Sequence, residues 1–414
     1  MTEGGEVEPS GHAFRVSQLR IPRLSEVDFP GLRRNRLQRL QEAMKAHELA
    51  VCLFFNPATV RYATGAPMMD AWAATTFARA ALVPASGQPI LYEFEVGIPV
   101  SSRVVADVRP VINWSFAGDQ ARPIARRWVR EVKSALQELG LADEPLGLDK
   151  LDMPGFLAMA DEGVRLVDAG PAVVDAREVK TAEEVDLFKI NGAIGDAILA
   201  AVEANVRPGI REYELLAIAT DTLLRFHGET LFTRLITSGT NTNPWLQEAN
   251  DKLVMPGDLV AVDTDANGFE GYVIDVSRTF LCGSSPSPAQ REAYRVAHEC
   301  VTGMVDLVRP GMSYSDFVYG APRLPDKFVA QRYSVQAHQS GLEDEGPFFP
   351  YPEDVERGAV IPDRILQENM ILNVECYAGE VSAPFGVKLE DQLLVTATGC
   401  EVLSTYPFDE KLLG

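Results

Sequence analysis

The sequence predicts two domains of mixed helix and strand: an α/β domain followed by an α+β domain that contains an internal repeat. With 414 residues, of which 46% are apolar, the chain can bury a large core and is long enough for more than one domain. In the first part, strand-like apolar runs alternate with helical patterns. In the second part, a helix, Pro-Gly, helix pattern occurs twice. We place a polar arm at residues 1–30 and the two domains at 31–175 and 176–414.

Composition limits the class of partner. The chain has 38 basic and 59 acidic side chains, a net charge of −21, which disfavours nucleic acid or an anionic membrane as the main partner and favours a small-molecule substrate. The five cysteines show no CxxC spacing, so neither a disulfide framework nor a thiolate zinc site is expected. Residues 1–15 do not read as a signal segment, and no apolar run reaches eighteen residues. We therefore expect a cytoplasmic protein that is not bound to a membrane.

The first domain is expected to begin with a helix over residues 32–47, where Leu37, Leu40 and Met44 recur at helical spacing. The elements predicted after it are strands at 49–55 and within 80–92, an amphipathic helix at 122–139 closed by Gly140, and a strand-like stretch at 173–179. Thr181 followed by Glu184 resembles a capping box and predicts the start of a long helix. We place the domain boundary between residues 168 and 180.

The second domain carries the repeat. The run VRPGI at 206–210 and the run VRPGM at 308–312 lie 102 residues apart, each after a long helical pattern. Pro and Gly stop a helix, and a second amphipathic stretch begins near Glu212 or Ser315. Taken alone, the two runs could be common helix-stop chemistry. The matching flanks favour a domain with pseudo-twofold symmetry.

The segment 258–280 reads as a β-hairpin that carries three aspartates. Asp263 and Asp265 are two residues apart on a strand and therefore point to the same face. A tight turn at residues 267–268 would set Asp275 opposite Val260. A wider loop, centred on residues 269–270, pairs residues whose numbers sum to 538 or 540 and sets Asp275 opposite Asp263 or Asp265. We favour the wider loop, although exposed hairpin carboxylates are the ordinary alternative.

Three like charges on an apolar strand face need compensation, because burial raises the pKa of a carboxyl group strongly. Bound divalent cations usually supply the compensating positive charge. Three further candidate ligands, His338, Glu375 and Glu390, lie in strand-like contexts that would otherwise exclude charge. Such an oxygen-rich set without thiolates suits Mn²⁺, Fe²⁺ or Zn²⁺ in a site whose two ions lie roughly 3.5–4 Å apart.

Several stretches resemble the pita-bread metalloenzyme family, which includes creatinase, prolidase and methionine aminopeptidase. Residues 56–65 are similar to the creatinase-type amino-terminal domain, and the runs GYVIDVSRTF, MILNVECY and GVKLEDQLLVT are similar to the metal-binding strands of the catalytic domain. The resemblance implies a creatinase-like α/β domain, an α+β pita-bread catalytic domain and a homodimer. It also implies two divalent metal ions, iron first with manganese or zinc as alternatives. The ligands expected are Asp263, Asp265, Asp275, His338, Glu375 and Glu390.

The chain departs from the peptidase pattern at three positions. Thr264 stands where peptidases have their first metal Asp, Trp245 replaces one His, and Glu345, preceded by Asp344, replaces another. Peptide hydrolysis in this family relies on those imidazoles to polarise the carbonyl group and to protonate the leaving amine. A different reaction is therefore expected.

The arrangement of Asp263, Asp265, Tyr333, His338 and Asp344 resembles the branch of the family that cleaves dimethylsulfoniopropionate by β-elimination. That resemblance makes Asp344 the base, with Tyr333 beside it. Core packing for Tyr333 and a solvated loop for Asp344 are the alternatives.

A sulfonium substrate is attracted to aromatic faces. Trp245 is the first candidate for this contact and Trp72 the second, although ordinary packing would explain Trp72 as well. In the implied homodimer one subunit's amino-terminal domain borders the other's active site, so that Trp72 would act in trans.

Two other functions stay open. One is a dinuclear-metal C–N hydrolase of the creatinase, ectoine hydrolase or Xaa-Pro dipeptidase type. The other is a binding module without metal, against which the retained acidic ligands and His338 speak.

Overall fold

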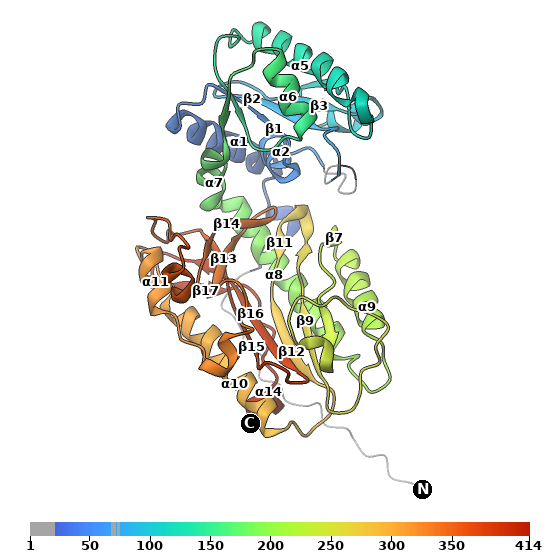
Figure 1. Ribbon diagram of the computed structural model, residues 1–414, viewed down its shortest axis with the longest axis vertical. Helices are drawn as coiled ribbons and strands as arrows, with labels where there is room; N and C mark the ends of the chain where they lie inside the picture. Colours follow the sequence, from blue (N-terminus) through green and yellow to red (C-terminus); the bar gives the residue numbers. More distant parts are fainter. Residues whose placement is uncertain (1–20, 68–71, 73–74) are drawn as a thin grey trace. The chain divides into compact units, whose positions relative to one another are not determined.

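The structure is a computed structural model that describes residues 21–67, 72 and 75–414 (Figure 1). The chain divides into two compact units, one formed by Ser25–Glu184 and the other containing Val185–Gly414. Residues 1–20 of the predicted arm lie outside the described residues. The rest of that arm includes a short 3₁₀ helix, η1 (Leu24–Glu26), and the buried Val27, and the first α-helix already begins at Phe29.

The amino-terminal unit is built on a six-stranded sheet of order β4-β3-β2-β1-β5-β6. Its strands are β1 (Val51–Phe54), β2 (Ala80–Pro84), β3 (Ile90–Glu93), β4 (Asp107–Pro110), β5 (Leu146–Leu148) and β6 (Leu166–Asp168). Its helices are α1 (Phe29–Ala46), α2 (Pro57–Thr64), α4 (Ile98–Ser101), α5 (Ala121–Glu138), α6 (Met153–Asp161) and α7 (Gly170–Glu178), with 3₁₀ turns η2 (Glu95–Gly97) and η3 (Gly118–Gln120). Strands β1, β2 and β3 are buried along their whole length, as in an α/β fold with helices on both faces (Figure 1).

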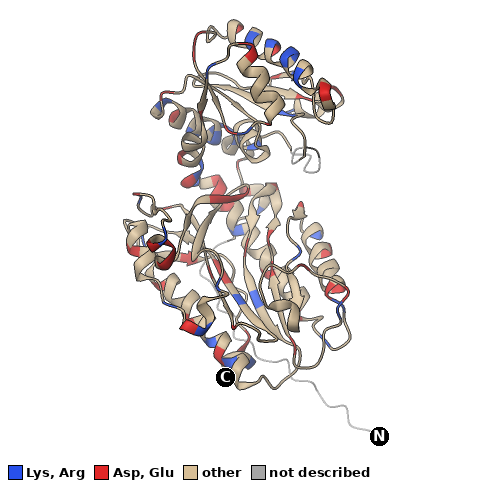
Figure 2. Ribbon diagram, viewed as in Figure 1, with Lys and Arg blue, Asp and Glu red and all other residues tan. Residues whose placement is uncertain are grey.

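Helix α5 of this unit has one face buried in the core and the opposite face exposed to solvent. Trp128 of α5 packs in the core against Phe55 and Trp114. The row of basic residues on the opposite face of α5, visible in Figure 2, pairs with carboxylates of α6, as in the contacts of Arg122 with Asp161. This row is therefore already neutralised by its neighbours.

One predicted element of this unit is wrong. The stretch 173–179, expected as a strand, lies almost entirely in helix α7. Pro171 occupies the first turn, where its fixed φ suits a helix. Ala172 and Ala176, four residues apart, are buried on one face, and α7 packs against α1. Packing of α7 on α1 outweighs the preference of Val173 and Val174 for a strand.

The second unit contains two sheets. The larger runs in the order β14-β13-β15-β16-β12-β9-β8, with β17 paired to β16, and the smaller in the order β11-β10-β7. The strands are β7 (Thr230–Leu231), β8 (Ile236–Ser238), β9 (Leu259–Asp263), β10 (Ala266–Asn267), β11 (Val273–Ile274), β12 (Ser277–Leu281), β13 (Ala337–Ser340), β14 (Asp344–Phe349), β15 (Ile371–Gly379), β16 (Gly386–Val395) and β17 (Cys400–Val402). The longest, β15 and β16, are buried throughout.

Helices surround these sheets. They are α8 (Ala182–Glu203), α9 (Glu212–Arg225), α10 (Pro288–Leu307), α11 (Tyr314–Gly320), α12 (Asp326–Val329), α13 (Pro352–Glu356) and α14 (Glu410–Leu413), with 3₁₀ turns η4 (Gly239–Thr242) and η5 (Phe269–Gly271). The predicted capping box opens α8: the Thr181 N–H donates to Glu184 Oε2 at 2.8 Å, and the Glu184 N–H donates to Thr181 Oγ1 at 3.3 Å. Within the described residues, no helix combines the length and the apolar character that a membrane span requires.

The structure confirms the predicted repeat. Helices α8 and α9 are joined through Gly209, and helices α10 and α11 through Gly311, both at positive φ. The Gly209 N–H donates to the Val254 carbonyl at 2.8 Å, and the Gly311 N–H donates to the Leu366 carbonyl at the same distance. The same backbone contact thus occurs at equivalent points of the two halves, as a duplicated helix, Pro-Gly, helix unit requires.

The structure also confirms the wider hairpin loop. Ala266 pairs with Ile274, and Asp263 pairs with Ser277, so the numbers of paired residues sum to 540. The 3₁₀ turn η5 forms the loop. This register places Asp265 opposite Asp275.

Candidate metal centre

Six side chains from the middle of the larger sheet and its hairpin converge in the second unit. Asp263 ends β9, Asp265 and Asp275 lie in the adjoining hairpin, and the other three are His338 on β13, Glu375 on β15 and Glu390 on β16. Each is at most 9% exposed. The structure therefore buries together all six residues that the sequence singled out as metal ligands.

Their donor atoms form two overlapping groups. Asp275, His338 and Glu390 make one group, and Asp263, Asp265 and Asp275 make the other, with the donor atoms of each group within 4.8 Å of one another. Glu375 lies beside the first group, with its Oε1 3.7 Å from His338 Nε2. Two groups that share the Asp275 carboxylate are the arrangement expected for two neighbouring cations.

The residues fit such ions by a second criterion. Asp263 Oδ1, Asp275 Oδ1 and Glu375 Oε1 are buried without a hydrogen-bond partner. A buried carboxylate oxygen that nothing satisfies is costly, and proteins rarely keep one without a role. Oxygen donors and one imidazole suit a divalent cation of intermediate hardness.

The pKa values show the same need for positive charge. Burial, reinforced by the neighbouring carboxylates, raises the pKa of Asp265 and of Asp275 well above the ordinary range. Burial likewise raises the pKa of Glu375 to about 8, against the influence of Lys388 and His338. Glu390 differs: burial would raise its pKa, but Lys388 and His338 lower it below the usual value. Cations would allow all five carboxyl groups to ionise together.

Lys388 is the charged group at this centre that sequence reasoning missed. Its Nζ lies 2.6 Å from Glu390 Oε2, 3.0 Å from Glu375 Oε2 and 3.4 Å from Asp263 Oδ2, and it donates to Ser277 Oγ at 3.0 Å. Burial alone would lower the pKa of Lys388, but the three carboxylates raise it well above its usual value, so it stays an ammonium. A lysine in an apolar run two residues before Glu390, and so on the same strand face, was the available signal.

Tyr333 and Trp245, both singled out from the sequence, place their rings near the Lys388 ammonium. Lys388 Nζ is 5.2 Å from the ring centre of Tyr333 and 5.7 Å from that of Trp245. Trp245 is buried and also packs against Tyr377, with ring centres 5.8 Å apart. Burial and the nearby carboxylates raise the pKa of Tyr333, which keeps its hydroxyl protonated.

Asp344 begins β14 opposite Ser340 and is exposed. Part of the Asp344 side chain reaches solvent, but the surrounding protein still removes some of its hydration. This desolvation, with the charges of Glu390 and Asp263, raises the pKa of Asp344 to about 6, although His338 opposes the shift. Glu345 turns to the buried side, close enough to Gly341 that a Cβ there would collide with its carboxylate. The structure thus separates Asp344, which is open to solvent, from Glu345, which is not.

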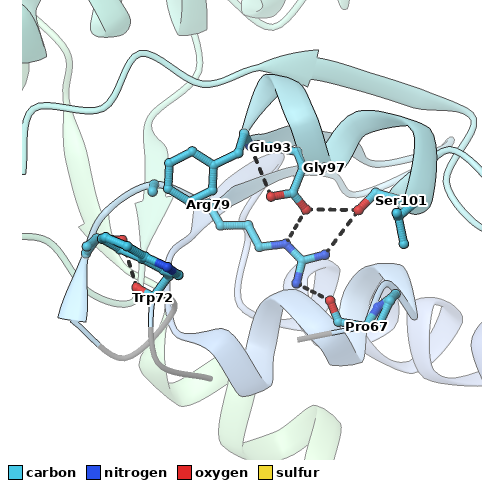
Figure 3. A pocket seen from close by; sticks show the side chains of 10 residues that line it. Pro67, Trp72, Arg79, Glu93, Gly97 and Ser101 are labelled. Carbon is cyan, nitrogen blue, oxygen red and sulfur yellow. Dashed lines mark hydrogen bonds and ion pairs between the residues drawn. The ribbon is translucent and has the colours of Figure 1, made fainter. Parts of the chain in front are cut away.

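Trp72 lies in the amino-terminal unit. It is half exposed and borders a cavity of about 270 Å³, with Phe94 edge-on at 6.2 Å (Figure 3). The buried pair of Arg79 and Glu93, with Nε and Oε2 2.9 Å apart, forms the polar part of the lining. Residues 68–71, which precede Trp72, lie outside the described residues.

Comparison with known proteins gives two family matches. Residues 186–397 match the profile of metallopeptidase family M24, and residues 36–179 match the creatinase/prolidase N-terminal domain. The chain is 29% identical to a dimethylsulfoniopropionate lyase DddP of Roseovarius nubinhibens, over 99% of this chain and 93% of that protein. It is also 29% identical to an Xaa-Pro dipeptidase of Pyrococcus furiosus, over 56% of this chain and 64% of that protein.

Among solved structures, an Xaa-Pro dipeptidase from Bacillus anthracis matches with a TM-score of 0.73 at 22% identity, over 91% of this chain and 98% of that one. The likeness shows a shared fold: an α/β creatinase-type domain followed by an α+β pita-bread domain.

Proposed function

The chain belongs to metallopeptidase family M24, and we propose that it is a metal-dependent lyase that cleaves dimethylsulfoniopropionate into dimethyl sulfide and acrylate. One observation carries the proposal. His338 is the single imidazole among the described residues of the centre, and Trp245 and Glu345 stand where the hydrolases that the chain resembles have histidine. The identity with a DddP lyase over 99% of this chain supports the same activity.

We propose that two divalent cations, iron or else manganese or zinc, are held by Asp263, Asp265, Asp275, His338, Glu375 and Glu390. When bound, such ions attract the substrate carboxylate and stabilise the negative charge that develops on the carbon beside it. The overlapping donor groups and the unsatisfied oxygens described above support this ligand set.

Asp344 acts as the base in this proposal. Its carboxylate accepts the proton from the carbon next to the substrate carboxylate, a double bond forms, and the C–S bond breaks. The electron pair of that bond leaves with sulfur as neutral dimethyl sulfide. A pKa of about 6 leaves Asp344 ionised at neutral pH and makes it a better proton acceptor than an ordinary aspartate. Because a sulfonium leaving group needs no proton, the reaction needs fewer imidazoles than peptide hydrolysis.

Tyr333 and Trp72 have supporting roles in this proposal. The hydroxyl of Tyr333 stays protonated and would donate a hydrogen bond beside the base. The sequence favours Trp245 and Trp72 for the sulfonium group. Trp245 is buried and already faces the Lys388 ammonium, so Trp72 is the tryptophan that we propose for this contact. We also propose a cytoplasmic homodimer in which Trp72 serves the partner's site; light scattering of the purified protein tests the dimer.

A C–N hydrolase is the second candidate function. The match to metallopeptidase family M24 and the identity with an Xaa-Pro dipeptidase favour it. A metal-free binding module is the third, and elemental analysis that found no metal in the purified protein would support it.

Headspace gas chromatography separates these functions. The metal-loaded protein is incubated with dimethylsulfoniopropionate, and in parallel with an Xaa-Pro dipeptide, creatine and ectoine. The lyase releases dimethyl sulfide and an equal amount of acrylate, and chelator-treated protein releases neither. Hydrolysis of one of the other substrates without any dimethyl sulfide would establish the hydrolase instead.

A further inference from the structure

Phe348 is an exposed aromatic residue beside the candidate centre. Its ring centre lies 6.0 Å from that of His338, and 52% of the residue is accessible. On the same strand, β14, Asp344 is also exposed, whereas Glu345 and Phe349 are buried. Phe348 and the proposed base are therefore both exposed residues of β14, and Phe348 lies next to a proposed metal ligand.

The other aromatic rings at the centre already face a cation. Tyr333 and Trp245 both lie within 6 Å of the Lys388 ammonium, and Trp245 is only 8% exposed. A cation bound against these rings would approach a buried positive charge, which repels it. Among the described residues, the cation contacts of aromatic rings do not include Phe348, whose ring neighbour is His338, a proposed metal ligand.

We propose that the ring of Phe348 binds the dimethylsulfonium end of the substrate and so selects a cationic leaving group, an inference that rests on the lyase function proposed above. In dimethylsulfoniopropionate only two methylene groups separate the carboxylate from the sulfur. A substrate whose carboxylate reaches the ligands around His338, and whose carbon proton reaches Asp344, must place its sulfonium group within a few bonds of both. Phe348, beside His338, offers an accessible aromatic surface within that range.

Variants of two phenylalanines test this role. Phe348→Leu removes the aromatic face but keeps an apolar side chain, and Phe348→Tyr keeps the face. Phe226→Leu is the matched control, because Phe226 is the C-cap residue that follows α9 and is 51% exposed. Two unreactive inhibitors are compared in each protein: 3-(trimethylammonio)propionate, which is cationic at one end, and 4,4-dimethylpentanoate, in which a carbon atom replaces the nitrogen and removes the positive charge.

Phe348→Leu is expected to raise the KM for dimethylsulfoniopropionate and the inhibition constant of the cationic inhibitor by about two- to tenfold, with a smaller change in kcat. The inhibition constant of 4,4-dimethylpentanoate should stay unchanged, and Phe348→Tyr and Phe226→Leu should resemble the wild type.

Three other outcomes overturn the proposal. Equal weakening of both inhibitors would mean that Phe348 supplies only apolar packing. Unchanged constants, in a wild-type protein that releases dimethyl sulfide, would mean that the ring does not contact the substrate, while the lyase function stands. Absence of dimethyl sulfide from the wild type would overturn the lyase function and this inference with it.

Discussion

Two side chains at the candidate centre use their two oxygens differently. Asp263 and Glu375 each place one oxygen near Lys388 and leave the other without a hydrogen-bond partner. The charges also balance. Five carboxylates carry five negative charges, and Lys388 with two divalent ions supplies five positive charges. Lys388 is therefore a built-in counter-ion, and in the proposed centre it would leave the second oxygens of these carboxylates free for the metal ions.

Replacing Lys388 by methionine should destabilise the metal-free protein by about 3 kcal/mol, because it leaves buried carboxylates without their partner. Urea denaturation of the metal-free protein measures the change. Lys388→Arg keeps the positive charge and should lower the free energy of unfolding by less. The control is Lys252→Met, which removes a half-buried ammonium bonded to Asp258 and Ser238. A loss no larger than that of the control would contradict this role.

Replacing Asp344 by asparagine should lower kcat by about 10²- to 10⁴-fold, the usual contribution of a positioned base. Elemental analysis should show the same metal content as in the wild type, since Asp344 is in neither donor group. Glu343→Gln, one residue earlier, is the control. Wild-type turnover in Asp344→Asn would exclude it as the base.

The sequence was sufficient to predict that the acidic residues lie together, but not which other side chains surround them. Asp263, Asp265 and Asp275 follow from strand alternation and hairpin register, which are local. The roles of Lys388 and Phe348 depend on β16 lying between β15 and β12 and on β14 lying beside β13, which only the topology of the whole sheet decides. The catalytic roles themselves remain predictions.

At the scale of elements, backbone geometry repeats where the sequence repeats. Gly209 has φ +86° and Gly311 has φ +83°, and a Cβ at either position would meet open space. Their requirement for glycine is therefore conformational. The local pattern was sufficient here, whereas at residues 173–179 it was not, because a short run with three valines fits a strand or a helix until its packing partner, α1, is known.

Gly209→Ala and Gly311→Ala should each lower the free energy of unfolding by about 1–2 kcal/mol, the cost of a left-handed alanine. Thermal and urea denaturation measure it. Gly399→Ala, where a Cβ also meets open space but φ is not positive, should change stability by less than about 0.5 kcal/mol. A cost confined to one of the two glycines would count against equivalent roles in the repeat.

Asp149 joins the end of β5 to the end of β1. It accepts hydrogen bonds from the Phe55 N–H at 2.8 Å and the Asn56 N–H at 3.1 Å. Burial nevertheless raises its pKa to about 6, because desolvation outweighs these bonds. The folded protein therefore holds this proton more tightly than the unfolded chain, whose pKa is about 4. The stabilisation is complete below pH 4 or so and is lost as the pH rises through about 6.

The Asp149→Asn variant carries an amide at this position, which does not titrate between pH 4 and pH 7. The stability of the wild type relative to this variant should therefore fall by about 2 kcal/mol between pH 4 and pH 7. Urea denaturation of both proteins across this range measures the difference. A difference independent of pH would show that Asp149 is ionised throughout.

At the scale of the molecule, the whole candidate centre belongs to the unit that contains Val185–Gly414. An ion that binds only the folded state stabilises the part that holds it, by about 2.7 kcal/mol at a concentration one hundred times its dissociation constant. Removal of metal should thus affect one unit selectively.

Chelation should increase amide hydrogen exchange in β9, β12, β13, β15 and β16 and leave strands β1 to β3 unchanged. Hydrogen exchange with mass spectrometry of the metal-loaded and chelated protein measures this, and re-addition of metal is the control. Equal changes in both units, or none, would contradict a centre confined to the second unit.

The two halves of the repeat contribute unlike chemistry to this centre, aspartates from the first and an imidazole with two glutamates from the second. The donor group of Asp275, His338 and Glu390 therefore draws on both halves. A fragment that contained a single half would offer a cation only part of that group, and two complementary fragments would have to associate before the whole group could form.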